Sequence, residues 1–176
     1  MSTAQRHLTA ALAAAARGWH VFPLQTNAKR PALHGHTRCP GAGPCANGHH
    51  GWEQRATTDP DRIRCAWSHG PFNIGIATGP SNLVVVDLDV PKQDDPPRPA
   101  AWSLPGVGDG ADVFTVVCQS AEQPVPWDTC TVGTPSGGIH LYFAAPAGVE
   151  LRNTGGERGN GLGWKVDTRA HGGYVV

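Results

Sequence analysis

Several features that would narrow the class of protein are missing from this sequence. It carries no net charge, with 14 Lys and Arg against 14 Asp and Glu, so it lacks the basic excess of proteins that coat nucleic acids. No apolar run approaches the roughly 20 residues that cross a bilayer, and the N-terminus lacks the apolar core of a signal peptide. We therefore expect a cytoplasmic protein with no membrane partner, in which any contact with nucleic acid is local.

Cysteine is scarce and irregularly placed. The chain has five cysteines, an odd number, and their uneven spacing does not fit a disulfide framework. They are Cys39, Cys45, Cys65, Cys118 and Cys130. We interpret them as reduced thiols, two of which serve as metal ligands.

Glycine and proline, in contrast, are abundant. The chain of 176 residues contains 23 Gly and 16 Pro, which predicts long loops rather than long helices. Its length fits one domain, 1–176, with room for a hydrophobic core. Because the chain ends on the apolar stretch 173–176 without a polar tail, we expect it to be a fragment of a longer polypeptide.

Apolar periodicity and capping residues predict three helices and seven strands. The helices are expected over 3–17, 60–67 and 111–121, and the strands over 19–24, 73–78, 83–89, 129–134, 139–143, 163–167 and 173–176. A tight turn joins strands 73–78 and 83–89, so we expect them to pair as a hairpin. We expect residues 91–108 to form a flexible loop. This order of elements favours an α+β fold with a mainly antiparallel sheet flanked by helices.

The most informative stretch is 83–90, where a buried apolar strand is interrupted by Asp87 and Asp89. Because side chains alternate across a strand, the two carboxylates project from the same face. Their mutual repulsion and poor solvation are costly, and a divalent cation with oxygen ligands, Mg²⁺ or Mn²⁺, relieves both. In the alternative interpretation, the strand runs out into solvent and the aspartates belong to a loop.

Two later stretches also place polar groups at the ends of apolar strands. Asp167 would add the third carboxylate that a two-ion site needs. The glycines of the Ser136–Gly138 turn allow phosphate oxygens to approach backbone N–H groups, with Ser136 and His140 as side-chain donors. Taken singly, each of these residues is more often a turn former or a core residue.

Together and in this order, the three stretches resemble the N-terminal primase/polymerase domain of bifunctional DNA primase-polymerases, in the archaeo-eukaryotic primase superfamily. The resemblance covers nearly the whole chain. Its motifs are 73–77 leading to 84–89, then 134–143, then 165–169 continuing to 173–176.

The resemblance implies an RRM-like catalytic core over 73–176, with two divalent ions on the triad Asp87, Asp89 and Asp167. It also implies a nucleotide site, made by Ser136, Gly137, Gly138, His140, Lys165 and Arg169. The activity implied is template-dependent nucleotidyl transfer by a DNA primase and polymerase, with a DNA template and primer and (d)NTP as partners. Family members often continue into a helicase domain on the C-terminal side.

Two other functions remain open at this point. The spacing Asp-x-Asp also occurs in metal-dependent glycosyltransferases, which hold manganese and a nucleotide diphosphate, although nothing else in the chain supports that class. A zinc-containing nucleic-acid-binding module that has lost its chemistry is the alternative outside enzymology.

A second group of candidate site residues lies in residues 25–55. This long stretch has no apolar periodicity, so we expect a cross-link to hold it in place. We expect a structural Zn²⁺ held by four residues: His34, Cys39, Cys45 and His49. His36 could replace His34, His50 could replace His49, and Cys65 is an outside candidate. The alternative is a histidine-rich loop with two free cysteines. Four protein ligands would leave no open coordination position, so the expected role is structural.

Overall fold

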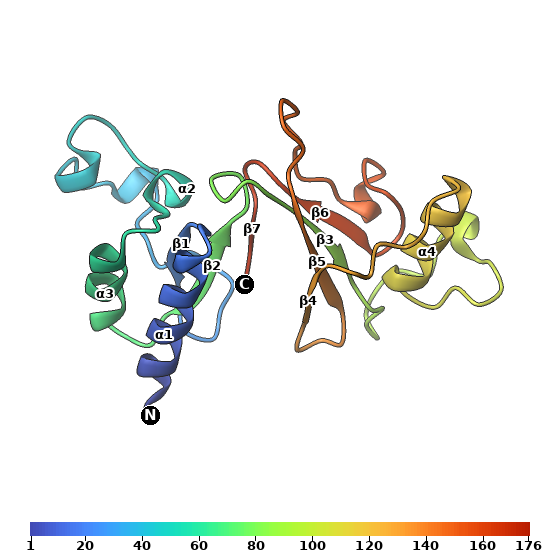
Figure 1. Cartoon of the computed structure of the whole chain (residues 1–176), viewed down its shortest axis with the longest axis horizontal. Helices are drawn as coiled ribbons and strands as arrows, with labels where there is room; N and C mark the ends of the chain where they lie inside the picture. Colours follow the sequence, from blue (N-terminus) through green and yellow to red (C-terminus); the bar gives the residue numbers. More distant parts are fainter. The chain divides into compact units, whose positions relative to one another are not determined.

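The structure, a computed structural model of the whole chain, describes residues 1–176 apart from the side chain of Glu157. The chain divides into two compact units, each of which is described by itself. Unit 1 comprises residues 1–82 and 172–176, and unit 2 comprises residues 83–171. Each unit combines helices with an antiparallel sheet (Figure 1), so the predicted α+β class is confirmed.

Unit 1 is a three-stranded sheet with helices packed against it. Its strands are ordered β1-β2-β7. Its elements are α1 (Thr3–Ala16), β1 (Val21–Leu24), the 3-10 turns η1 (His36–Arg38) and η2 (Gly43–Cys45), α2 (Trp52–Arg55), α3 (Pro60–Ser68), β2 (Asn73–Ala77) and β7 (Tyr174–Val175). The helix ends follow their capping signals, since Ser2 caps α1 and Asp59 caps α3 through side-chain hydrogen bonds.

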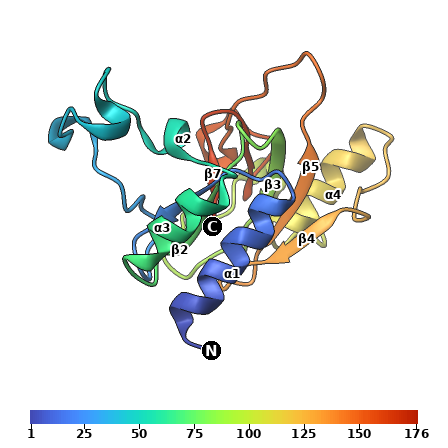
Figure 2. The same cartoon turned by 60° about the vertical axis from the view of Figure 1, so that its left-hand side comes forward.

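The two faces of the unit 1 sheet have separate cores. Val21 packs with the alanine face of α1 and with Ile63 and Trp67 of α3, and the two helices lie side by side in both Figure 1 and Figure 2. Phe22 points to the other face, where its ring contacts Trp52 and Tyr174 at centroid distances of 5.0 and 5.3 Å. This alternation is the two-residue period of a strand buried on both sides.

Unit 2 is a four-stranded antiparallel sheet with one long helix. Its strands are ordered β4-β5-β3-β6. Its elements are β3 (Leu83–Leu88), η3 (Ala100–Trp102), α4 (Gly110–Ser120), β4 (Cys130–Gly133), β5 (Ile139–Ala144), η4 (Gly156–Arg158) and β6 (Val166–Arg169). Asp109 caps α4 by accepting hydrogen bonds from the N–H groups of Ala111 and Asp112.

Helix α4 covers one face of the unit 2 sheet. Its residues Val113 and Phe114 share a buried cluster with alternate residues of three strands, Val86, Leu88, Leu141 and Val166. The residues between these point away from α4 because side chains alternate along a strand. The polar residues of the predicted motifs therefore occupy the opposite face.

The predicted hairpin between 73–78 and 83–89 is wrong. β2 pairs with β1 and β7, whereas β3 pairs with β5 and β6 in the other sheet. At the turn between them, Asn82 adopts a left-handed backbone with φ of +52°, and the chain passes from one sheet to the next. The expected strands 129–134 and 139–143 are present as β4 and β5, which pair in antiparallel order on either side of the Ser136–Gly138 turn.

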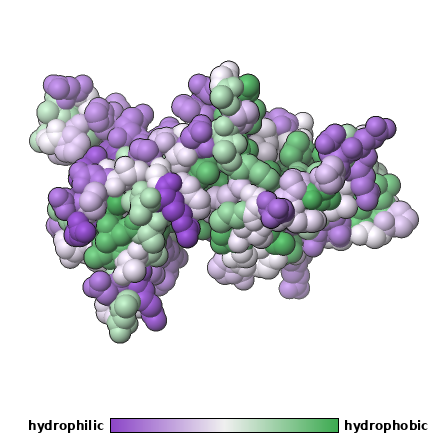
Figure 3. All heavy atoms as spheres, viewed as in Figure 1, coloured by the Kyte–Doolittle hydropathy of each residue, from purple (hydrophilic) through white to green (hydrophobic). Residues whose placement is uncertain are grey.

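Residues 91–108 are also more ordered than expected. They contain η3, and Trp102 and Val107 pack against the unit 2 core. Hydrophobic and hydrophilic residues are intermixed over the face drawn in Figure 3. No described helix is long and apolar enough to cross a membrane.

Candidate active site

A row of polar residues crosses the unit 2 sheet on the face opposite α4. In the antiparallel register, Asp87 of β3 lies directly opposite His140 of β5 on one side and Asp167 of β6 on the other. Directly opposed residues share a face and lie close together. Three residues that are distant in sequence are thus brought together by strand pairing, and all three were predicted as site residues.

Asp87 is the centre of this row. Its Oδ1 lies 3.3 Å from Nε2 of His140, and its Oδ2 lies 3.5 Å from Nη2 of Arg169. Burial acts to raise the pKa of Asp87, but the hydrogen bonds and charges of His140 and Arg169 outweigh it and hold the pKa below its usual value. Asp87 is therefore an anion at neutral pH in spite of its burial.

Asp167 is fixed from two sides. The N–H of Gly156 donates to its Oδ1 at 2.9 Å, and Nη2 of Arg169 lies 2.8 Å from its Oδ2. The same guanidinium nitrogen thus lies between Asp87 and Asp167. The family resemblance placed Arg169 in the nucleotide site, and no signal in the sequence indicated this bridging position.

Asp89 follows the end of β3. Its backbone is anchored, because its N–H donates to the carbonyl of Lys165 and its carbonyl accepts from the N–H of Gly110, both at 2.9 Å. Burial raises the pKa of the Asp89 carboxyl, and the charges of Asp87 and Asp167 raise it further. The three carboxylates therefore interact electrostatically, as the sequence predicted for the first two.

The Ser136–Gly138 turn lies against the same end of β3. A Cβ added at Gly138 would be 2.6 Å from the carbonyl oxygen of Leu88 and 3.4 Å from Cα of Asp89. Gly137 has φ of +90°, a conformation that favours glycine. The turn is therefore adjacent to Asp89 only because these two positions carry no side chain.

Lys165 is buried, with 8% of its surface exposed, and its Nζ lies 2.7 Å from Oδ2 of Asp95. Asp95 also accepts a hydrogen bond from the N–H of Lys92. The hydrogen bonds from Lys165 and Lys92 hold the pKa of Asp95 below its usual value. Asp95 lies in the stretch expected to be flexible, and only its place in the Lys92–Asp95 turn could have indicated it.

His140 is buried beside Asp87. Its Nδ1 has no hydrogen-bond partner among the described residues. A buried polar atom without a partner is uncommon. The imidazole therefore retains one hydrogen-bonding position beyond its contact with Asp87.

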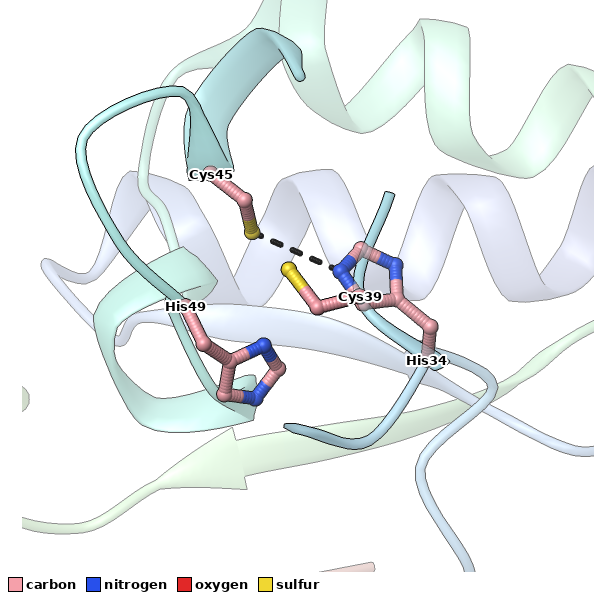
Figure 4. Close-up of side chains that lie close together, drawn as sticks. All are labelled: His34, Cys39, Cys45 and His49. Carbon is pink, nitrogen blue, oxygen red and sulfur yellow. Dashed lines mark hydrogen bonds between the residues drawn. The ribbon is translucent and has the colours of Figure 1, made fainter. Parts of the chain in front are cut away.

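A separate cluster in unit 1 is formed by four predicted ligands. One ligand atom from each of His34, Cys39, Cys45 and His49 lies within 4.8 Å of the others, and Figure 4 shows the four side chains pointing toward one another. Among the described residues this is the one group of three or more His, Cys, Asp or Glu that is compact enough to hold a metal ion. The three carboxylates of unit 2 are not drawn together to this degree.

The structure also selects the register of the cluster. Nε2 of His34 lies 3.4 Å from Sγ of Cys45, and His50 contributes its backbone N–H to the same sulfur at 3.4 Å. The outside candidates His36, His50 and Cys65 do not belong to the group.

The surroundings of His49 favour its neutral imidazole. Burial lowers the pKa of His49, and the charges of His36, His34 and Arg55 lower it further. Its Nδ1 is buried without a hydrogen-bond partner among the described residues. A neutral histidine with a vacant nitrogen is the form that ligates a metal ion.

The fold and the two clusters define a class of protein. This is an α+β domain whose antiparallel sheet presents partly buried carboxylates beside cationic side chains, with a Cys/His cluster in a separate unit. The family model described as "Bifunctional DNA primase/polymerase, N-terminal" matches residues 11–176. The chain belongs to this family, and the resemblance drawn from its three motifs is confirmed.

A search among curated proteins gives no match. The family nevertheless defines the activity in general terms, as a DNA primase/polymerase that carries out nucleotidyl transfer and binds DNA and nucleotides. Such nucleotidyltransferases generally use divalent metal ions.

Proposed function

We propose that the chain catalyses template-dependent nucleotidyl transfer at Asp87, Asp89 and Asp167, using two Mg²⁺ or Mn²⁺ ions. The observation that carries this proposal is the row in which Asp87 lies between His140 and Asp167. The carboxylates of this site are partly buried, which costs solvation free energy that a purely structural role does not repay. A polymerase needs them to bind cations beside a triphosphate.

The unit 2 sheet supports the description of an RRM-like core. Strand β3 leads through α4 to the hairpin of β4 and β5, and β6 then returns beside β3. This order places the first strand at the centre, between the third and the fourth, as in split βαβ folds. The second helix of such folds is replaced by the loop 145–165, which contains only η4 among its described elements.

The carboxylates fit a divalent cation, because a cation already stands between two of them. Arg169 contacts Asp87 and Asp167 with one nitrogen, and hard carboxylate oxygens are the ligands that Mg²⁺ and Mn²⁺ prefer. Ions held by Asp87, Asp89 and Asp167 would supply Lewis-acid chemistry for activating a primer 3′-hydroxyl or an initiating nucleotide and for neutralising charge on the triphosphate.

The remaining residues position the substrate. We assign His140 to the nucleotide phosphates, with the Ser136–Gly138 turn offering backbone N–H groups beside Asp89. Arg169 neutralises the Asp87–Asp167 pair in the free protein and turns to the phosphates when the nucleotide binds. Lys165 exchanges its partner Asp95 for the same phosphates. Catalysis is then positioning and electrostatics, without a covalent intermediate.

The second part of the proposal is a structural Zn²⁺ on His34, Cys39, Cys45 and His49. Two cysteines and two histidines match the donor set of structural zinc sites, and all four coordination positions are taken by protein. The metal would hold a loop whose single deeply buried side chain, among residues 25–51, is that of Cys45.

One observation favours a second candidate, a nucleic-acid-binding module without catalysis. Arg169 already neutralises two of the three carboxylates, as it would in a site that binds no metal. Metal-dependent primer extension distinguishes the two functions.

The test of catalysis is extension of a labelled primer on a DNA template with Mn²⁺ and dNTPs, comparing the wild type with Asp87→Asn. We expect the variant to lose more than about 100-fold in rate, because it lacks an anionic ligand. Asp128→Asn is the matched control, since Asp128 is exposed and lies outside the row. Circular dichroism checks that both variants fold. Wild-type activity in the folded Asp87→Asn variant would overturn the assignment.

A further inference from the structure

The neutral charge of the whole chain conceals two units of opposite sign. Unit 1 contains eight of the 14 Lys and Arg residues but only three of the 14 Asp and Glu, a difference of five in favour of positive charge. Unit 2 has the complementary share, six basic against eleven acidic residues, and is negative by the same amount.

The asymmetry is strongest at the start of the chain. The first acidic residue is Glu53, so the preceding 52 residues contain five Lys and Arg and six His without one carboxylate side chain. They include α1, β1 and the whole Cys/His cluster. Folding gives these cations few partners nearby, since the ion pair that the structure describes within unit 1 joins Arg64 to Asp61 on α3.

Three of these cations have exposed side chains and lie in hydrogen-bonded turns. Lys29 and Arg30 lie in a turn after β1 whose carbonyls accept hydrogen bonds from the Tyr174 hydroxyl and from the N–H of Gln25. Arg38 ends η1, immediately before the cluster residue Cys39. None of the three forms an ion pair with a described side chain. Fixing cations without counter-ions costs stability through self-repulsion.

Such an arrangement fits a polyanion. We propose that Lys29, Arg30 and Arg38, here called the unit 1 cations, bind backbone phosphates of the single-stranded DNA template. This inference rests on the proposed polymerase function, which makes DNA the polyanion to be held. Unit 2 carries a net negative charge, so a net electrostatic attraction for DNA outside the nucleotide site is expected from unit 1. Phosphate contacts do not read bases, as a polymerase that copies any template requires.

The unit 1 cations also give the Cys/His cluster a further role. Arg38 and Cys39 are adjacent in the chain, so a metal bound by His34, Cys39, Cys45 and His49 would fix the backbone that carries Arg38. A template surface on this loop would thus be ordered by the structural metal without metal contacting DNA.

The test measures binding of a fluorescein-labelled oligo(dT) by the full chain as a function of KCl, without nucleotide and without added Mg²⁺ or Mn²⁺. The variant Lys29→Ala/Arg30→Ala/Arg38→Ala is compared with Lys92→Ala/Arg152→Ala/Arg158→Ala, which removes the same charge from exposed positions in unit 2. Single strands release about 0.7 counterions for each phosphate contact. We therefore expect the slope of log K against log [KCl] to fall by about 2 in the unit 1 variant and to be unchanged in the unit 2 variant.

Equal losses in both variants would overturn the proposal, because binding would then follow net charge rather than a surface. An unchanged slope in the unit 1 variant would overturn it as well. The proposed catalysis is tested separately. A wild type that binds oligo(dT) with the expected slope but fails to extend a primer would contradict polymerisation and leave the template surface intact. A unit 1 variant that extends normally only at raised template concentration would support both.

Discussion

At the scale of single residues, the site is a balance of charges around Asp87. His140 and Arg169 lower the pKa of Asp87 and stabilise its anion. Burial and the charges of Asp87 and Asp167 raise the pKa of Asp89 and so disfavour its anion. The pKa values of two carboxyl groups two residues apart are therefore moved in opposite directions. A bound cation would remove the repulsion that Asp89 experiences and would also be attracted by the anionic Asp87, so the site is suited to bind one.

The raised pKa of Asp89 predicts the pH dependence of stability. Because the folded-state pKa exceeds the unfolded one, ionised Asp89 disfavours folding above the folded pKa, and the penalty disappears below the unfolded pKa. We expect Asp89→Asn to raise the melting temperature at pH 7 by on the order of 2 °C, with the gain vanishing as the pH falls toward 4. Thermal melts between pH 4 and pH 8 measure this.

The same melts with added Mn²⁺ give the control. The wild type should be stabilised by the ion through linkage, and Asp89→Asn should be stabilised less. A variant that melts below the wild type at pH 7 would show that Asp89 contributes a favourable contact instead of stored repulsion.

At the scale of elements, the sequence predicted local structure well and long-range pairing poorly. Capping residues located α1, α3 and α4, and the strands β4 and β5 were expected where they occur, on either side of the Ser136–Gly138 turn. The partners of β2 are β1 and β7, which are far away in sequence, and no local signal specifies such partners. The same limit explains the site. The order of the motifs suggested that Asp87, His140 and Asp167 lie together. The position of Arg169 between two carboxylates and the pairing of Asp95 with Lys165 depend on side-chain packing, which the periodicity of the sequence does not encode.

The close approach of the Ser136–Gly138 turn to β3 can be tested at one glycine. Gly138→Ala places a Cβ 2.6 Å from the carbonyl oxygen of Leu88, so the turn must move away from Asp89 at a cost of about 1–3 kcal/mol. We expect a lower melting temperature and a raised KM for the nucleotide.

Gly133→Ala is the matched control for this substitution. It changes the same hairpin at a position where an added Cβ meets nothing within 4 Å, so its stability and KM should be close to those of the wild type. Equal effects of the two substitutions would mean that the hairpin is sensitive to any side chain and that the approach to Asp89 is unimportant.

At the scale of the whole molecule, the two units carry different sites: the proposed catalytic residues lie in unit 2 and the Cys/His cluster lies in unit 1. Unit 2 has a continuous core between its sheet and α4, and it carries every carboxylate and nucleotide residue proposed here. Unit 1 has two smaller cores and a long loop that cannot be ordered by apolar burial. The Cys/His cluster lies in that loop, so removal of a metal should affect the units unequally.

The last prediction concerns that metal. Protein purified without chelator should contain one equivalent of zinc per chain by elemental analysis, held by His34, Cys39, Cys45 and His49. Because a metal that binds only the folded chain contributes its binding free energy to folding, Cys39→Ser/Cys45→Ser should lose the zinc and lower the melting temperature. Hydrogen exchange should rise in residues 25–55 and stay unchanged in α4 and its sheet.

Cys65→Ser/Cys130→Ser removes two exposed thiols outside the cluster and should retain both the zinc and the melting temperature. Primer extension by the zinc-free variant, measured below its melting temperature, should still require Asp87. Less than about a tenth of an equivalent of zinc in the wild type would contradict the assignment, given the tight affinities of such sites.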